Sequence, residues 1–374
     1  MYPSARHQYE QNQQALVEFP TTLEAVYARI DAFDPAHYAR SRNFLNGGVS
    51  YLSPYLSRGF ITVPQVVARL KERGIGMEQA EKFIQELAWR EFYTRTWFQK
   101  GDAIFSDIRH PQEGVLYQGI PAAVLEAETG IRSLDTFLAT FPLRGYLHNH
   151  LRMYLAAITC NVGKYHWSAP AAWLYYHLLD GDLASNALSW QWCAGTFSSK
   201  LYYVNQENVN KYTGSRQTDT FLDYSYEDLI LRETPEELRE SANPKLVFTP
   251  PVTKALEIQQ DLPTFIYTHY TLDPTFHEGE EGNRILVLEP SHFAKHPMAP
   301  NTIEFIILLA ENIPGIQVFY GEIAQLPVNG VFRDHPINAH FQGIREVHPS
   351  LAPGLQGEFN SFFSFWNKLS KKLS

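Results

Sequence analysis

Apolar residues recur at helical intervals along the chain up to about residue 225. The longest such run lies in the stretch 77–100, where Phe83, Leu87 and Phe92 stand at helix-like spacings. Further helices are predicted over residues 149–162, 170–179 and 182–193. The pattern therefore predicts a region built from helices between about residues 20 and 225.

The pattern changes after this region. Residues 232–262 combine Glu, Pro, Asn and Lys with scattered apolar positions, which is typical of a linker. Short apolar runs follow at 264–268, 284–288 and 316–320, and a helical stretch, 300–312, separates the last two. This strand–helix–strand order predicts a small parallel α/β unit. An amphipathic stretch, 359–373, comes last.

These patterns predict an α+β protein in three parts. We expect a helical domain over residues 1–230, a linker over 231–262 and a small α/β domain over 263–374. The length of 374 residues is enough for one large or two ordinary domains. Apolar residues make up 44%, which excludes a disordered chain.

Charge and composition exclude several classes of protein. Up to Ser225 there are 20 basic against 21 acidic residues, and beyond it 11 against 19. A basic coat for nucleic acid is therefore excluded, whereas a local basic groove in the first part is not. No apolar run approaches the roughly 18 residues of a membrane span. Residues 1–14 lack the apolar core of a signal peptide, and only two cysteines are present, so we expect a cytoplasmic protein with no membrane partner.

The densest group of polar residues is the string LLDGDLASN, residues 178–186, which the tripeptide WQW follows at 190–192. One interpretation is a tight turn between helices, in which Gly181 ends one helix and Asp182 caps the next. The other is a binding site for a polyfunctional ring. Carboxylates accept hydrogen bonds from ring and ribityl groups, and an amide can face a nitrogen whose protonation changes with redox state.

Two further strings combine polar and aromatic residues. In ELAWREFY, residues 86–93, the charges suit a solvated, salt-bridged helix face, but Trp89 is unusual within it. In YLHNHLRM, residues 146–153, two histidines suggest a metal, yet no Asp, Glu or Cys stands nearby at ligand spacing. Prolines flank His292 and His296, which predicts a loop rather than a metal-binding helix. We therefore expect no metal site.

The loop NGGVSYLSPYLSRG, residues 46–59, offers hydroxyls and backbone N–H groups before a helix start. Such a loop can hold an anion, and the alternative is a loop that only caps the helix.

Taken in order, these motifs resemble the flavin domain of the DNA photolyase/cryptochrome family over about residues 38–223. The elements are Tyr38-x-x-x-Arg42-Asn43-Phe44, the Ser50/Ser53 loop, ELAWREFY, Thr129–Gly130, LHNHLRM and DGDLASN…WQW. The resemblance implies an all-helical domain that holds non-covalent FAD, followed here by the small C-terminal α/β domain. The family normally begins with an α/β domain for an antenna chromophore. Only about 37 residues precede Tyr38, so we expect neither that domain nor an antenna chromophore.

The resemblance assigns residues to the flavin pocket. Those that match positions around FAD are Tyr38, Ser50, Leu52, Ser53, Phe83, Glu86, Asn149, Arg152, Asp180, Asp182 and Asn186. Arg152 and Asp180 match an ion pair over the isoalloxazine, and Asn186 matches the residue that faces its N5. Val49 stands where the family usually has Thr, so one hydroxyl contact is missing.

The resemblance also implies a DNA site and an electron path. Residues that match the surface for a flipped-out pyrimidine dimer are Glu86, Trp89, Asn149, Met153 and Trp192. Trp89 and Trp192 would provide stacking walls. Trp190 and Trp167 match the first two members of a tryptophan electron-transfer chain, with Tyr117 or Trp173 as candidates for the third. Core packing is the other role open to these tryptophans.

The function implied is light-driven repair of cyclobutane pyrimidine dimers in DNA. Asn149 stands where enzymes for the (6-4) photoproduct tend to have His, which implies little (6-4) activity. His150 stands where repair enzymes of this type often have Arg. A cryptochrome-like blue-light receptor is therefore the second hypothesis, and a flavin protein without a light role is the third. The candidates for phosphate contact are Arg58, Arg90, Arg95 and Lys200.

Overall fold

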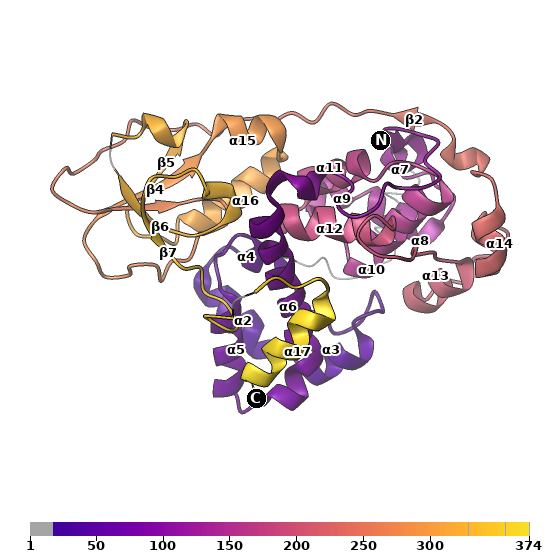
Figure 1. Cartoon of the computed structure of the whole chain (residues 1–374), viewed down its shortest axis with the longest axis horizontal. Coiled ribbons are helices and arrows are strands. Elements are labelled where there is room, and N and C mark those ends of the chain that lie inside the picture. Colours follow the sequence, from indigo (N-terminus) through magenta and orange to yellow (C-terminus); the bar gives the residue numbers. More distant parts are fainter. Residues whose placement is uncertain (1–17, 328, 356, 374) are drawn as a thin grey trace.

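The structure, a computed structural model, describes residues 18–327, 329–355 and 357–373. A helical part and a parallel sheet lie end to end along its longest axis (Figure 1). The helices of the helical part are α2 (Leu23–Ala32), α3 (Pro35–Ser41), α4 (Ser53–Ser57), α5 (Val63–Glu72), α6 (Met77–Lys100), α7 (Ala122–Glu126), α8 (Arg132–Leu138), α9 (Phe141–Arg144), α10 (Asn149–Ala156), α11 (Ser168–His177), α12 (Leu183–Cys193), α13 (Gln206–Thr213) and α14 (Tyr226–Leu231). The predicted helical region is confirmed, whereas residues 1–14, on which the signal-peptide argument rests, lie outside the described residues.

Helix α6 is the longest element, at 24 residues. Its Glu, Gln, Ala and Lys residues favour helix strongly, and Phe83, Leu87 and Phe92 lie on its buried side. It ends at Gly101, whose φ of 54° other residues rarely adopt. Because α6 packs against α3, α12 and α17 (Phe362–Leu373), it is the element around which the candidate site is assembled.

The predicted helix over 149–162 forms in two pieces. Helix α10 occupies the first eight residues, and a fully buried π-helical turn, η2 (Ala157–Val162), completes it. The 3₁₀ segments η1 (Gly101–Phe105) and η3 (Glu236–Leu238) follow α6 and α14. Part of the predicted linker is anchored to the helical part, since β1 (Ile120–Pro121) pairs with β2 (Ser241–Ala242) and the Tyr165 hydroxyl donates to the Leu238 carbonyl at 2.9 Å.

The sheet has five strands in the order β5-β4-β3-β6-β7, and all four neighbouring pairs are parallel. The strands are β3 (Thr264–Tyr267), β4 (Asn283–Leu288), β5 (Ile316–Tyr320), β6 (Gly330–Arg333) and β7 (Gly343–Glu346). Helices α15 (Pro290–Lys295) and α16 (Pro300–Ala310) connect β4 to β5, with the 3₁₀ segments η4 (Ile323–Gln325) and η5 (Pro336–Asn338) further on. The predicted parallel pairing of 284–288 with 316–320 is confirmed. The loop predicted at His292 and His296 is wrong, because Pro290 begins a helix there that His296 caps.

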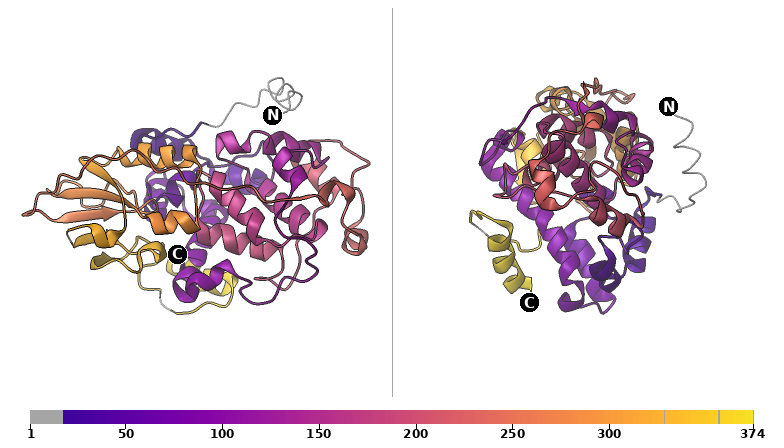
Figure 2. Two further views of the ribbon diagram at one scale, coloured as in Figure 1. Left: turned by 90° about the horizontal axis from the view of Figure 1, so that it is seen from above. Right: turned by 90° about the vertical axis from the view of Figure 1, so that its right-hand side faces the viewer.

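The sheet and the helical part share one apolar core. A single cluster of buried side chains includes Leu87 and Leu188 from helices together with Phe265, Leu286 and Ile306 from the α/β part. Backbone hydrogen bonds also cross this junction, from Leu272 to the Arg58 carbonyl and from Ala299 to the Tyr176 carbonyl. The left view of Figure 2 shows the sheet and the helical part side by side from above. Among the described residues, no helix combines the length and the apolar character needed to cross a bilayer.

Candidate functional site

The turn between α11 and α12 carries the buried carboxylate of an ion pair whose arginine is half-buried. The Arg152 Nη2 lies 3.0 and 2.9 Å from the two carboxylate oxygens of Asp180, which is 5% exposed. Arg152 also donates from Nε to the Leu147 carbonyl at 2.7 Å, and the Leu179 N–H donates to the Gly145 carbonyl. The predicted pairing of Arg152 with Asp180 is therefore present, and both partners are oriented by the backbone around them.

The same turn is held from the other side by the end of α4. Arg58 donates from Nε to the Leu179 carbonyl at 2.9 Å and from Nη2 to the Gly181 carbonyl at 2.7 Å, and Ser57 donates to the Asp180 carbonyl. Arg58 is 0% exposed. The prediction that Arg58 meets DNA phosphate is wrong, because a fully buried guanidinium that holds two loop residues in place cannot reach a DNA strand.

Asp182 and Asn186 position the first two turns of α12. The Asp182 carboxylate accepts from the Ser185 N–H at 2.7 Å and so caps the helix, as the turn interpretation predicts, while its Oδ2 lies 4.0 Å from Arg90. Asn186 donates from Nδ2 to the Ala171 carbonyl at 2.8 Å, and no described residue donates to its Oδ1. An amide fixed in this way presents its oxygen as an acceptor for a ring N–H.

A cavity of about 380 Å³, with two aromatic residues in its lining, lies beside the predicted loop of Ser50 and Ser53. The residues that line it are Glu18, Arg29, Ala32, Phe33, Val49, Ser50 and Tyr51. Leu52, which is fully buried, and Ser53 follow directly at the start of α4. Tyr38 and Phe83 pack on Phe33 with ring centroids 5.7 and 4.5 Å away, so these predicted flavin residues lie behind one wall of the cavity.

Tyr146 links this cavity to the ion pair. Its ring lies 5.5 Å from that of Tyr51, and the Arg152 guanidinium lies 5.5 Å from its centroid. The structure therefore brings the serine loop, Arg152 and Asp180 into one continuous region. The sequence analysis did not select Tyr146 as a site residue. Its only signal in the sequence was its position at the start of the string YLHNHLRM.

Glu86 forms its ion pair with a residue outside its own helix, α6. Its Oε1 accepts a hydrogen bond of 2.6 Å from Nη1 of Arg42, the residue that caps the C-terminal end of α3. Burial raises the pKa of Glu86, although the positive charge of Arg42 opposes this shift. Burial, followed by the Arg42 charge, lowers the pKa of His150 to about 4. Arg42 thus joins α3 to α6, a role that its presence in the motif Tyr38-x-x-x-Arg42 did not reveal.

The predicted lesion-facing residues differ in exposure. Asn149 is exposed, Met153 and Trp89 are half-buried, and Trp192 is 38% exposed with its ring 5.8 Å from Tyr202. Trp89 is covered by Phe362 of α17, at a centroid distance of 3.7 Å and an interplanar angle of 8°. Sequence reasoning missed Phe362, because its only signal was the amphipathic pattern of 359–373.

The predicted electron-path tryptophans are both buried, at 2% exposure each. Trp167 donates from its indole to the Asp107 carboxylate at 2.7 Å, and Trp190 lies in the same apolar cluster. Tyr117 is half-buried and stacks on Tyr165 at 5.0 Å, whereas Trp173 is 4% exposed. Because a terminal donor has to exchange electrons with solvent, Tyr117 is the better placed of the two candidates.

No group of three or more His, Cys, Asp or Glu in the described part of the chain is arranged to hold a metal ion. The histidines of YLHNHLRM have other partners: the His148 ring accepts from the His150 N–H at 3.1 Å, and the His150 ring packs on Tyr154 and Tyr212. Both are local packing and capping residues.

Residues 83–259 match the model of the FAD binding domain of DNA photolyase. This segment of the chain is similar to a photolyase-type FAD-binding domain. The match contains the Arg152–Asp180 pair and Asn186 but begins after Tyr38 and the serine loop, and it extends through most of the region predicted as linker. The buried ion pair and the anchored amide fit the cofactor of this domain, which is FAD.

Curated relatives are similar over part of their length. The chain is 31% identical over 163 residues to a deoxyribodipyrimidine photo-lyase of Streptomyces griseus, covering 43% of this chain and 35% of that protein. It is 33% identical over 183 residues to the one from Thermus thermophilus, covering 46% and 42%. The solved Synechocystis cryptochrome aligns with a TM-score of 0.47 and 22% identity over 54% of this chain and 45% of that one. The chain thus spans less than half the length of the curated relatives that it matches here.

Proposed function

We propose that this photolyase-type chain repairs cyclobutane pyrimidine dimers in DNA with light. The observation that supports it most directly is the face of α10 that carries Asn149, Arg152 and Met153, which are spaced so that they project to one side. This face starts at the exposed Asn149 and ends at the buried pair of Arg152 with Asp180. It therefore connects the surface, where DNA would bind, to the flavin pocket.

Bound FAD, once reduced and excited, would supply the electron that splits the cyclobutane ring and would take it back afterwards. The residues of this chain orient the partners. Glu86 is fixed by Arg42, and no described residue donates to its Oε2, which leaves an acceptor for a pyrimidine N–H. Asn149 offers an amide with both donor and acceptor groups to the second pyrimidine. Trp89 and Trp192 provide ring faces against which an extracted base can stack.

The lesion preference follows from the chemistry at the start of α10. Splitting a cyclobutane dimer requires no proton shuttle, so it is sufficient that Glu86 accepts a hydrogen bond from one pyrimidine and that the Asn149 amide bonds the other. A (6-4) lesion needs a proton transferred to it, and an amide cannot act as a general acid at neutral pH. We therefore expect cyclobutane repair with little (6-4) repair.

A blue-light receptor without repair activity is the second candidate. Two observations favour it: His150 packs between Tyr154 and Tyr212 instead of providing the cation that repair enzymes often have there, and Phe362 covers Trp89. A receptor would use the flavin and the tryptophans for photoreduction without extracting a base.

The deciding experiment illuminates the reduced, FAD-loaded protein with an oligonucleotide that carries one lesion. A cyclobutane thymine dimer, a (6-4) photoproduct and an undamaged strand are tested in parallel, each with a dark control. We expect loss of the cyclobutane dimer only in the light. Repair of neither lesion would support the receptor, and repair of the (6-4) product alone would overturn the argument from Asn149.

A further inference from the structure

Helix α17 lies across α6 at the surface where a flipped base would stack (Figure 1). The ring of Phe362 is nearly parallel to Trp89, with centroids 3.7 Å apart. Phe92 and Tyr93 contact Trp89 at 5.9 and 5.3 Å in tilted or edge-on arrangements. Phe362 is therefore the one described aromatic residue that stacks flat on the indole.

The helix is held by one apolar face. Phe362, Phe365 and Leu369 are 3% exposed or less, while Phe363 is 62% exposed. The Arg95 guanidinium lies 5.4 Å from the centre of the Phe365 ring and donates to the Leu355 carbonyl at 2.7 Å. Arg95, a predicted phosphate contact, is thus engaged by the segment around α17 and by Glu91.

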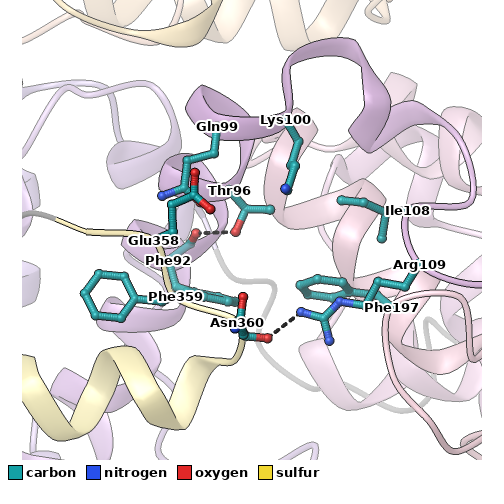
Figure 3. A pocket seen from close by; sticks show the side chains of 10 residues that line it. All are labelled: Phe92, Thr96, Gln99, Lys100, Ile108, Arg109, Phe197, Glu358, Phe359 and Asn360. Carbon is teal, nitrogen blue, oxygen red and sulfur yellow. Dashed lines mark hydrogen bonds between the residues drawn. The ribbon is translucent and has the colours of Figure 1, made fainter.

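The segment that leads into α17 is less closely packed than the helix. Glu358, Phe359 and Asn360 form one wall of a cavity of about 300 Å³, whose opposite side includes Thr96, Lys100 and Arg109 (Figure 3). The Arg109 side chain bonds the Asn360 carbonyl across this gap. A cavity at this position lowers the free energy needed to undock α17 from α6, because few contacts are lost there.

We propose that α17 is an intramolecular occupant of the lesion site, in which Phe362 takes the place of the flipped pyrimidine on Trp89. This inference rests on the proposed function. One face of an indole accepts one flat ring, so the base and Phe362 compete for it. The apparent dissociation constant for the lesion then equals the intrinsic constant divided by the fraction of molecules in which α17 is undocked.

The first test measures binding in the dark, so that no dimer is repaired. The probe is an oligothymidylate with one central cyclobutane dimer, and the proteins are the full parent chain, Phe362→Ala and the matched control Phe363→Ala, which removes the neighbouring exposed ring. We expect Phe362→Ala to bind the dimer about tenfold more tightly than the parent, with Phe363→Ala close to the parent. Equal or weaker binding by Phe362→Ala overturns the proposal.

The second test uses only the parent chain, so it does not depend on how a variant folds. Trypsin cleaves after Lys368, Lys371 and Lys372 of α17 faster when the helix is undocked. Because competition is reciprocal, the dimer oligonucleotide should accelerate this cleavage, whereas the undamaged strand should not. Cleavage that dimer DNA slows or leaves unchanged contradicts the proposal.

The outcomes separate the two proposals. If the parent chain binds the dimer and Phe362→Ala gains nothing, the role of α17 fails while the repair site stands. If only Phe362→Ala binds the dimer, both the lesion site and the occupant role are supported. If neither binds it, the lesion site itself is wrong and the inference fails with it.

Discussion

Asp180 and Asp182 stand two residues apart and have different roles. Asp180 neutralises the Arg152 guanidinium in a buried pocket, whereas Asp182 caps α12 through the Ser185 N–H. A buried charge pair stabilises little in net terms, but removal of one partner leaves the other charge uncompensated. At the scale of single residues, the predicted flavin pocket therefore depends on pairing more than on the number of charges.

We expect Asp180→Ala to lose FAD. The substitution leaves Arg152 largely buried without its carboxylate, at a cost of about 3–5 kcal/mol in the free energy of unfolding. Bound flavin is measured by absorbance after purification, and stability by urea denaturation. The control is Asp31→Ala, which removes an exposed partner of Arg69 far along the chain and should leave the flavin content unchanged. Full flavin retention by Asp180→Ala would show that the pocket is assigned wrongly.

We expect Trp190→Phe to slow photoreduction of oxidised FAD without loss of the cofactor. Phenylalanine keeps most of the buried volume at this position but is much harder to oxidise. The rate of flavin reduction under blue light with an external donor is the measurement. Trp97→Phe, at another buried tryptophan, is the control. If both variants photoreduce as fast as the parent, Trp190 is only a core residue.

At the scale of elements, the end of α4 holds the turn between α11 and α12. Three consecutive carbonyls of that turn, those of Leu179, Asp180 and Gly181, accept hydrogen bonds from Ser57 and Arg58. The arrangement explains why the end of this short helix is buried. It also places Asp180 relative to Arg152 without any contact between α4 and the carboxylate itself.

We expect Arg58→Met to lower the free energy of unfolding by about 3 kcal/mol, since two buried carbonyls lose their donors. The variant should also bind FAD more weakly, because the turn that carries Asp180 loosens. The salt dependence of DNA binding should stay as in the parent. Lys200→Ala, at an exposed lysine, is the comparison, and it should reduce the slope of log K against log salt by about one. A reduced slope for Arg58→Met would restore it as a phosphate contact.

At the scale of the whole molecule, a row of rings fills the junction between the sheet and the helices. His269 follows β3 and His335 follows β6, and the Tyr270 ring stacks on His335 at 4.6 Å. The ring centroids of His269 and His292 are 4.9 Å apart, and the guanidinium carbon of Arg58 lies 5.5 Å from the centroid of the Tyr270 ring. These histidines share a junction with a buried cation, so any proton added there is unfavourable. The division at residues 230 and 263 remains a prediction, because one core spans both parts.

We expect stability to fall as the pH is lowered from about 6.5 towards 4. Burial, followed by the neighbouring His296 and Arg58, lowers the pKa of His292 from an ordinary 6.5 to about 3. Burial lowers the pKa of His296 to about 4, although the Asp102 carboxylate opposes this shift. In this window the unfolded chain binds protons that the folded chain does not, which favours unfolding. Urea midpoints across the window measure the effect. His292→Gln should flatten the dependence of stability on pH. The control His37→Gln, at a residue outside the junction, should leave this dependence unchanged. If neither variant changes it, the buried histidines of the junction are not its source.

The local patterns were enough to predict the helical region, the parallel α/β unit and the family resemblance. Helical periodicity, capping residues such as Asp182 and short apolar runs depend on neighbours within a few residues, so they can be identified along the chain. Arg152 and Asp180 were found because each lies in a string of distinctive composition. The structure shows that they pair, as the resemblance implied.

Tertiary structure alone decided which charges and rings meet. Arg58 is indistinguishable from a surface arginine in its local string, yet folding buries it against a turn more than a hundred residues away. Arg42 and Glu86, and likewise Trp89 and Phe362, are partners from distant parts of the chain. Local sequence determines which element a residue joins, but burial and long-range contact depend on how whole elements pack, and that packing decides whether an arginine contacts DNA or supports a loop.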